Sequence, residues 1–309
     1  MLKYMLKRLL MVIPVLFGLA ILIFSIMYFV PGDPARIILG SEATEQEVMN
    51  LRIEMGLEEP YIIQLGHFLS DTFLHFDFGT SYISKQNVTE QLMLRLPNTL
   101  LIGYVGMLLA TIVGIPLGIL AALNRNNWKD SLISIVAMFG AALPGFWFAL
   151  VMCMYLSVKW GILPTIADGT FKGYIMAWIS VSIGAMASTV RMTRSSMLEV
   201  IRQDYITTAR AKGEPENRVI WIHALKNALI PIITSIGGGL GHVMGVSLIA
   251  ETIFSVPGIG VYLTSAINQR DYPIVRGGVL LVGFIFCLTM LAVDLIYAAV
   301  DPRLREKMK

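Results

Sequence analysis

Long apolar runs, separated by short polar segments, dominate the chain. An apolar run of about eighteen residues or more is typical of a membrane-spanning helix, because the hydrocarbon core of a bilayer is about 30 Å thick. Six such spans fit the sequence, with the approximate ranges 9–30, 99–123, 131–158, 174–190, 228–250 and 277–299. The pattern therefore predicts an all-α integral membrane protein with six transmembrane helices and both termini on one side.

Composition agrees with this prediction, and the distribution of charge predicts the orientation of the chain in the membrane. The chain is 56% hydrophobic and only 15% charged, whereas a soluble domain carries about 25% charged residues. Lysines and arginines concentrate on the inner side of a bilayer. With both termini inside, sixteen of them lie there, and the short outer loops hold four: Lys159, Lys172, Arg270 and Arg276. We expect cytoplasmic termini in a multi-pass protein of a prokaryotic cell membrane.

Two polar segments stand out within what we expect to be a single membrane domain, 1–309. Segment 31–97, predicted to be extracytoplasmic, holds ten acidic residues against four basic ones. Val48, Leu51 and Met55 recur at helical spacing within it and predict an amphipathic helix. The segment is large enough for a cap or a docking surface but too small for an independent domain. Segment 191–227 is predicted to be cytoplasmic.

Small residues recur at every fourth position in two of the spans. Such ladders let helix backbones approach closely in lipid. The residues are Gly106, Ala110, Gly114, Gly118 and Ala122 in one ladder, and Gly237, Gly241 and Gly245 in the other. Packing within the subunit explains both, and the sharper hypothesis places the second ladder at a pore or a subunit seam. On the same span, Ser235 and His242 are candidates for a translocation path, although a lone histidine is more often a packed polar residue.

Prolines and one carboxylate also lie within the spans. Pro116, Pro144 and Pro231 are expected to bend their helices, with neighbouring helices accommodating the bends. Asp294 is acidic and lies well inside the last span, where we expect it to pair with Arg303 or Arg305. An ion-coupled carrier would need several such charges near the middle of the membrane. Their scarcity argues against secondary transport.

The sequence carries no constellation of catalytic or metal-binding residues. His67, His75, His223 and His242 are scattered, and no HExxH, GxSxG or GxxxxGK[ST] motif occurs. Cys153 and Cys287 lie in apolar spans and are expected to be inert thiols. We therefore expect no enzyme, no metal, no nucleic acid and no cofactor on this chain. If transport is driven by energy, a separate subunit must bind ATP and Mg²⁺.

The stretch DYITTARAKG, within 191–227, has the pattern of a short docking helix. Tyr205, Ile206 and Ala209 fall on one face, a stripe that looks too small to form a core. Gly213 can adopt the left-handed conformation that ends a helix, and Pro215 suits the first turn of the next one. The result is a helix–turn–helix projection that suits a groove in a partner protein. The basic residues alone could instead satisfy topology or contact anionic lipid.

This loop resembles the cytoplasmic EAA loop of the permease subunits of prokaryotic ATP-binding-cassette (ABC) importers. The family pattern is E-A-A, three residues, Gly, nine residues and I-x-L-P. Thr207-Thr208-Ala209 occupy the E-A-A positions, Gly213 matches the glycine, and Leu225 matches the leucine. His223 and Lys226 replace the isoleucine and the proline. The missing glutamate removes any salt bridge that it makes in the family, so docking would depend on shape and on Arg210 and Lys212.

The rest of the chain is similar to one branch, the permeases of dipeptide, oligopeptide and nickel importers. The matching stretches are YFVPGDPA, FGTSY, LPNTLL, LPGFWFAL, HALKNALIPIIT, ETIFSVPGIG, RDYPIVRG and DLIYAAVDPRLR. The long polar segment after the first span indicates the B-type member of the permease pair.

The resemblance implies a type I importer permease with four partners in its complex and membrane lipid around it. These are a homologous second permease, two cytoplasmic ATPases and an extracytoplasmic solute-binding protein. The residues implied in coupling to an ATPase are Tyr205, Ile206, Ala209, Arg210, Ala211, Lys212, Gly213 and Leu225. Small peptides are the expected cargo, with nickel complexes, opine-like compounds and short sugars as alternatives.

Overall fold

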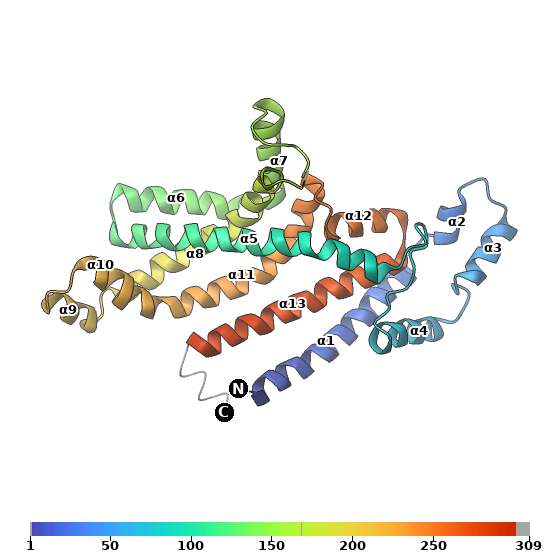
Figure 1. Ribbon diagram of the computed structural model, residues 1–309, viewed down its shortest axis with the longest axis horizontal. Helices are drawn as coiled ribbons and strands as arrows, with labels where there is room; N and C mark the ends of the chain where they lie inside the picture. The colour runs from blue at the N-terminus through green and yellow to red at the C-terminus, as the bar shows by residue number, and fades with distance from the viewer. Residues whose placement is uncertain (1, 168, 301–309) are drawn as a thin grey trace. The chain divides into compact units, whose positions relative to one another are not determined.

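A computed structural model describes residues 2–167 and 169–300, with side chains for 8–167 and 169–296. All regular elements in these ranges are helices (Figure 1), apart from an isolated bridge between Thr80 and Asn87. The chain divides into two compact units. Of the described residues, the first comprises Thr99–Val256 and 289–300, and the second comprises Leu2–Asn98 and Pro257–Leu288. The all-α prediction is confirmed.

The first unit is a bundle of long helices with short ones at its ends. Helix α8 packs along α11 and α6, and a short helix, α9, follows the end of α8 (Figure 1). The elements are α5 (Val88–Leu123, from Thr99 in this unit), α6 (Trp128–Ala142), α7 (Gly145–Met152), the π-helix η1 (Cys153–Lys159), α8 (Phe171–Val200), α9 (Asp204–Ala211), α10 (Glu216–Arg218), the π-helix η2 (Val219–Ala224), α11 (Leu225–Phe254) and the end of α13 (Tyr272–Val300, from Thr289 in this unit).

The second unit contains the first helix and the polar segment that follows it. Its elements are α1 (Leu2–Phe29), α2 (Pro34–Leu39), α3 (Glu45–Glu54), α4 (Tyr61–Leu74), the start of α5 up to Asn98, α12 (Ile259–Gln269) and the first part of α13 (Tyr272–Val300). Helix α3 is the helix predicted from the spacing of Val48. A capping box starts it, in which Thr44 accepts from the N–H of Glu47 and the Glu47 carboxylate accepts from the N–H of Thr44.

Five helices in the described residues are long and apolar enough to cross a membrane, and a sixth span results if α6 and α7–η1 count as one. The axis turns by 101° between these two helices, so the bend expected at Pro144 is in fact a break. Leu143, the residue before the proline, adopts an extended conformation and ends α6. Pro231, in contrast, lies inside a continuous α11. Arg303 and Arg305, the predicted partners of Asp294, lie outside the described residues.

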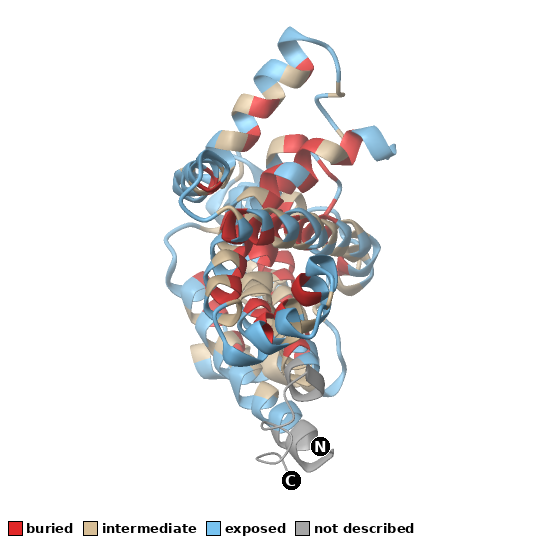
Figure 2. Cartoon of the chain, turned by 90° about the vertical axis from the view of Figure 1, so that its left-hand side faces the viewer, coloured by how far each residue is buried: buried red, intermediate tan, exposed pale blue. Residues whose placement is uncertain are grey.

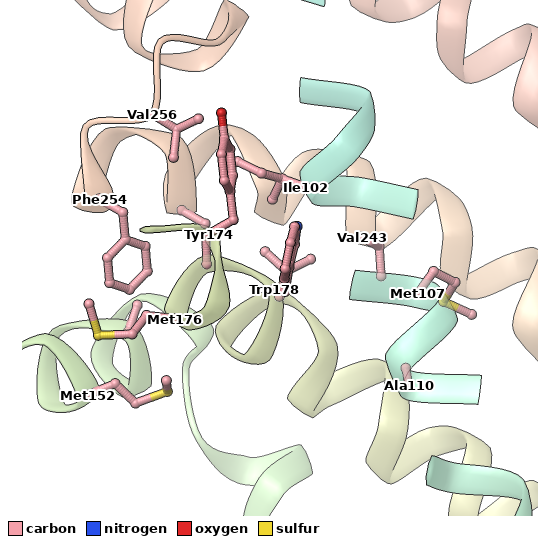
Figure 3. Packing of buried hydrophobic residues seen from close by; sticks show 14 of the residues in the cluster. Ile102, Met107, Ala110, Met152, Tyr174, Met176, Trp178, Val243, Phe254 and Val256 are labelled. Atoms are coloured by element: carbon pink, nitrogen blue, oxygen red, sulfur yellow. The ribbon is translucent and has the colours of Figure 1, made fainter. Parts of the chain in front are cut away.

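Buried apolar side chains hold each unit together, and exposed positions cover the outward faces of the helices (Figure 2). In the first unit, Tyr174 and Trp178 of α8 stack with their ring centroids 5.7 Å apart. Ile102 of α5 and Val243 of α11 belong to the same cluster (Figure 3). In the second unit, the cluster joins α1, α5, α12 and α13 around residues such as Leu92 and Ile259.

The first small-residue ladder packs against α8 within the subunit. A Cβ at Gly118 would lie 2.5 Å from Cβ of Thr193 and 2.7 Å from the carbonyl oxygen of Val190. At Gly114 it would lie 2.9 Å from Cβ of Thr189. These distances leave no room for a methyl group, so the glycines set how closely α5 and α8 approach.

Candidate coupling site

The predicted cytoplasmic segment 191–227 is built largely from the ends of two long helices. Helix α8 continues to Val200, beyond the predicted end of its span, and the helical stretch that becomes α11 already begins at Glu216. Helix α9 lies between them, at the tip of the first unit (Figure 1). Short connections join α9 to its neighbours, because α8 ends at Val200 and α10 begins at Glu216.

Ile206 fixes α9 to its own subunit. Its side chain is 0% exposed and packs in a cluster with Met197 of α8, Val219 of η2 and residues of α5 and α11. Ala209 lies at the edge of the same cluster. The expectation that this stripe is too small to form a core is therefore wrong. The missing partners come from four other helices, which a helical wheel of α9 alone cannot show.

Gly213 ends α9 as predicted. Its φ is +81°, in the left-handed region that favours glycine. Its N–H donates to the carbonyl of Arg210 at 2.9 Å, and the N–H of Glu214 donates to the carbonyl of Ala209 at 3.3 Å. These two bonds make a Schellman motif, which satisfies carbonyls that the helix end would otherwise leave free. Pro215 lies just outside the next helix, as the residue that precedes α10.

The remaining positions of α9 are exposed, and they include Tyr205, which the helical spacing had placed on one face with Ile206. The Tyr205 side chain is 44% exposed, and partial burial raises the pKa of its phenol above the ordinary value of 10.0. Ala211 and Lys212 are exposed at the end of the helix. The small side chain of Ala211 leaves this end of the helix open to close approach by a partner protein.

Arg210 already has a partner within the loop. Its guanidinium donates to both carboxylate oxygens of Glu216, at 3.1 and 2.7 Å. This hydrogen bonding raises the pKa of Arg210 further above its ordinary value. Arg218 and Glu214 form a second ion pair at 3.3 Å. Arg210 therefore braces the turn between α9 and α10, and Lys212 is the freer cation for docking.

Leu225 is half-buried against the cluster around Ile206. Its side chain therefore packs within the subunit, at the base of the loop and not at its exposed tip. Ser235 is half-buried and His242 is exposed on α11. Gly237 is buried, Gly241 is half-buried, and a Cβ at Gly245 would meet nothing within 4 Å. Their assignment to a translocation path or a subunit seam stays a prediction.

One support of the loop has no signal in the sequence. Asp130, at the start of α6, pairs with Arg194, near the end of α8. An aspartate in the first turn of a helix is already explained by the helix dipole. Nothing in the sequence pattern points to a partner so far along the chain.

Comparison with known proteins identifies the family. Residues 114–306 match the binding-protein-dependent transport system inner membrane component, and residues 1–103 match its N-terminal region. The chain belongs to this family.

Curated relatives match along the whole permease. It is 40% identical to the dipeptide transport system permease protein DppB of Alkalihalophilus pseudofirmus, across 99% of this chain and 100% of that protein. It is also 40% identical to the glutathione transport system permease protein GsiC of Salmonella typhimurium, with the same coverage. Among solved structures, the inward-facing MetNI methionine ABC transporter matches 69% of this chain and 97% of that chain, with a TM-score of 0.56 at 20% identity.

Family, relatives and fold agree on the class of protein. The chain is a multi-pass membrane permease of an ABC importer and is not itself an enzyme. The family description implies a binding protein and an ATPase as partners.

Proposed function

We propose that this chain is one half of the translocation pathway in an ATP-driven importer of small peptides, and that α9 is its coupling helix. The other half is a homologous permease. A solute-binding protein delivers cargo on the extracytoplasmic side, in part onto 31–97. Two ATPase subunits bind ATP and Mg²⁺ in the cytoplasm, and this chain binds neither.

The architecture of α9 carries the proposal. Ile206 faces the subunit's own core, Gly213 closes the helix, and Tyr205 and Ala211 face outward. A helix that is packed against its own subunit on one face and exposed on the other can bind a partner and move together with the bundle. Its small tip residues leave room for a groove in an ATPase.

Coupling of this kind requires that α9 bind differently to the two states of the ATPase, because equal binding shifts no equilibrium. In our proposal, ATP binding brings the two ATPases together and draws the coupling helices with them, which opens the permease pair outward. Hydrolysis then resets the assembly. The rigid connection of α9 to α8 and α11 supports transmission of this movement to the spans.

Peptides are the proposed cargo because the dipeptide and glutathione permeases match this chain over nearly its whole length. Nickel complexes, opine-like compounds and short sugars are the alternatives. Selection among them is assigned mainly to the solute-binding protein. An ion-coupled carrier is disfavoured, because the charged residues that it would need near the middle of the membrane are scarce in the sequence.

Crosslinking tests the coupling role. Cys153 and Cys287 are first replaced by serine, and Ala211→Cys is then introduced into the assembled transporter. We expect a crosslink between this cysteine and an ATPase subunit whose yield changes when ATP and Mg²⁺ are added. Lys129→Cys, at an exposed position in the first turn of α6, is the matched control and should give no ATP-dependent change. Equal yields from Ala211→Cys and Lys129→Cys in every nucleotide state would contradict the proposal.

Uptake assays test the cargo. The complete assembly in proteoliposomes, with ATP enclosed, should accumulate a labelled dipeptide when the binding protein is added outside. Competition by nickel, an opine or a disaccharide, with no effect of dipeptides, would assign the transporter to another cargo. Uptake by this single chain without ATPases would favour an ion-coupled carrier or a channel.

A further inference from the structure

Arg276 is a buried cation in the second unit, on the side predicted to be extracytoplasmic. It lies in the first turns of α13 and is only 9% exposed. Its guanidinium carbon lies 4.3 Å from the ring centroid of Phe24, 5.5 Å from that of Phe68 and 5.6 Å from that of Tyr272. Aromatic rings from α1, α4 and α13 therefore surround the charge.

In the part of the chain that the structure describes, no anion is paired with Arg276, and its Nε–H has no hydrogen-bond acceptor. A buried charge is costly unless it is both paired and hydrogen-bonded. Stacking on aromatic faces offsets part of this cost but does not replace an anionic partner. The rings thus stabilise the charge only in part, and the buried Nε–H is left without an acceptor.

Arg276 lines two clefts, so a small ligand can reach it. One cleft, of about 390 Å³, runs between α4, the loop after α3 and the stretch around Phe78. The other, of about 400 Å³, lies against Tyr28, Asp33 and Arg52. These volumes are at the lower end of those that hold small molecules in proteins, about 300–1,000 Å³.

The walls of the first cleft have the opposite charge. Glu54, Glu59, Asp71 and Asp77 line it together with Arg276. Four carboxylates repel a phosphate or another multivalent anion, but they attract an ammonium group. A ligand with a carboxylate at one end and an ammonium at the other complements both parts of this surface. A short peptide with free termini is such a ligand.

We propose that Arg276 is the base of an extracytoplasmic subsite that binds the terminal carboxylate of a short peptide. The guanidinium presents its N–H groups to the carboxylate, and the acidic wall holds the peptide's ammonium group. The aromatic rings fix the plane of the guanidinium, which favours two parallel hydrogen bonds to the carboxylate. The subsite rests on the proposed peptide import and adds a place at which this subunit meets its cargo.

Binding of two matched probes tests the subsite. Trialanine and trialanine amide differ only in the terminal carboxylate, and saturation-transfer NMR reports their binding to the complete transporter in nanodiscs, with the solute-binding protein omitted. We expect trialanine to bind on the order of tenfold more tightly than its amide. Arg276→Gln should remove this preference, and Arg276→Lys should retain part of it.

Two further variants separate binding from folding. Arg36→Gln removes an exposed arginine of the same unit that pairs with Glu45 and lines neither cleft, so it should keep the parent's preference. Arg95→Met removes another guanidinium stacked on a tyrosine, Tyr262, at 4.1 Å, and should also keep it. Recovery of the assembly and weak binding of the amide by Arg276→Gln show that this variant is folded.

Several results would overturn the subsite. These are equal binding of the two probes to the parent, a preference that survives in Arg276→Gln, and a preference that appears only when the solute-binding protein is present. The last result would assign the carboxylate recognition to that protein. ATP-driven uptake of a dipeptide by the parent is measured in parallel. Without any such uptake the proposed function fails, whereas uptake by the parent together with equal binding of the probes rejects only the subsite.

Discussion

Arg194 and Asp130 form a bidentate ion pair that joins α8 to the start of α6. Nε of Arg194 lies 2.6 Å from Oδ1 of Asp130, and Nη2 lies 2.7 Å from Oδ2. Oδ2 also accepts from the N–H of Asn126 at 3.1 Å, which holds the turn between α5 and α6. Because α8 leads directly into α9, the pair fixes the base from which the candidate coupling helix projects.

Removing one partner of this pair should destabilise the subunit. Asp130 is 6% exposed at its side chain, so Asp130→Asn leaves the Arg194 charge without its anion, at a cost of about 3 kcal/mol. Thermal unfolding in detergent is the measurement. The exchanged variant, Asp130→Arg with Arg194→Asp, should recover part of the loss. A parent-like melting temperature for both single variants, Asp130→Asn and Arg194→Gln, would show that the pair contributes nothing.

Neighbouring residues of α9 should respond in opposite ways. Ile206→Ala removes a fully buried side chain and should lower stability by about 2–5 kcal/mol. Tyr205→Ala removes an exposed ring and should change stability by about 0.5 kcal/mol or less, while weakening recovery of the ATPases with the permease. Unfolding and co-purification measure the two effects. If the ATPases co-purify with both variants as well as with the parent, α9 is not part of the ATPase interface.

Substitutions at Gly213 should act through the backbone alone. A Cβ there meets nothing within 4 Å, but the φ of +81° is unfavourable for alanine by about 1–2 kcal/mol. Asparagine tolerates this region better. We expect Gly213→Ala to reduce ATP-dependent uptake more than Gly213→Asn does. Limited trypsin cleavage at Lys212 should likewise increase more in Gly213→Ala than in Gly213→Asn. Equal uptake by both variants and the parent would show that the helix end does not matter for coupling.

The two small-residue ladders should differ in where they act. Gly118→Ala places a methyl group against Thr193 and the backbone of Val190, so it should destabilise the isolated subunit. Gly245→Ala meets open space, and its effect on stability should be small. If Gly245 lies at a subunit seam, Gly245→Leu should instead reduce recovery of the second permease. An unstable isolated Gly245→Leu subunit would place Gly245 in packing within the chain.

The sequence by itself determined the elements whose cause is local. Apolar length sets the spans, because a helix of about 20 residues must cross a core of fixed thickness. The capping residue Thr44 begins α3, and Gly213 ends α9, because each acts through bonds within one turn. The motifs around these elements also carried the resemblance to importer permeases that the family match confirms.

Only the tertiary structure decided which side of α9 faces inward, how sharply the chain turns at Pro144, and which charges meet. Ile206 is buried by side chains from four other helices, Asp130 is paired by Arg194, and Arg276 is enclosed by rings from three helices. Most of these contacts join positions far apart in the chain, such as Asp130 with Arg194 and Arg276 with Phe24. Their pairing depends on the summed packing of whole helices, and no local pattern of hydrophobic and polar residues encodes it.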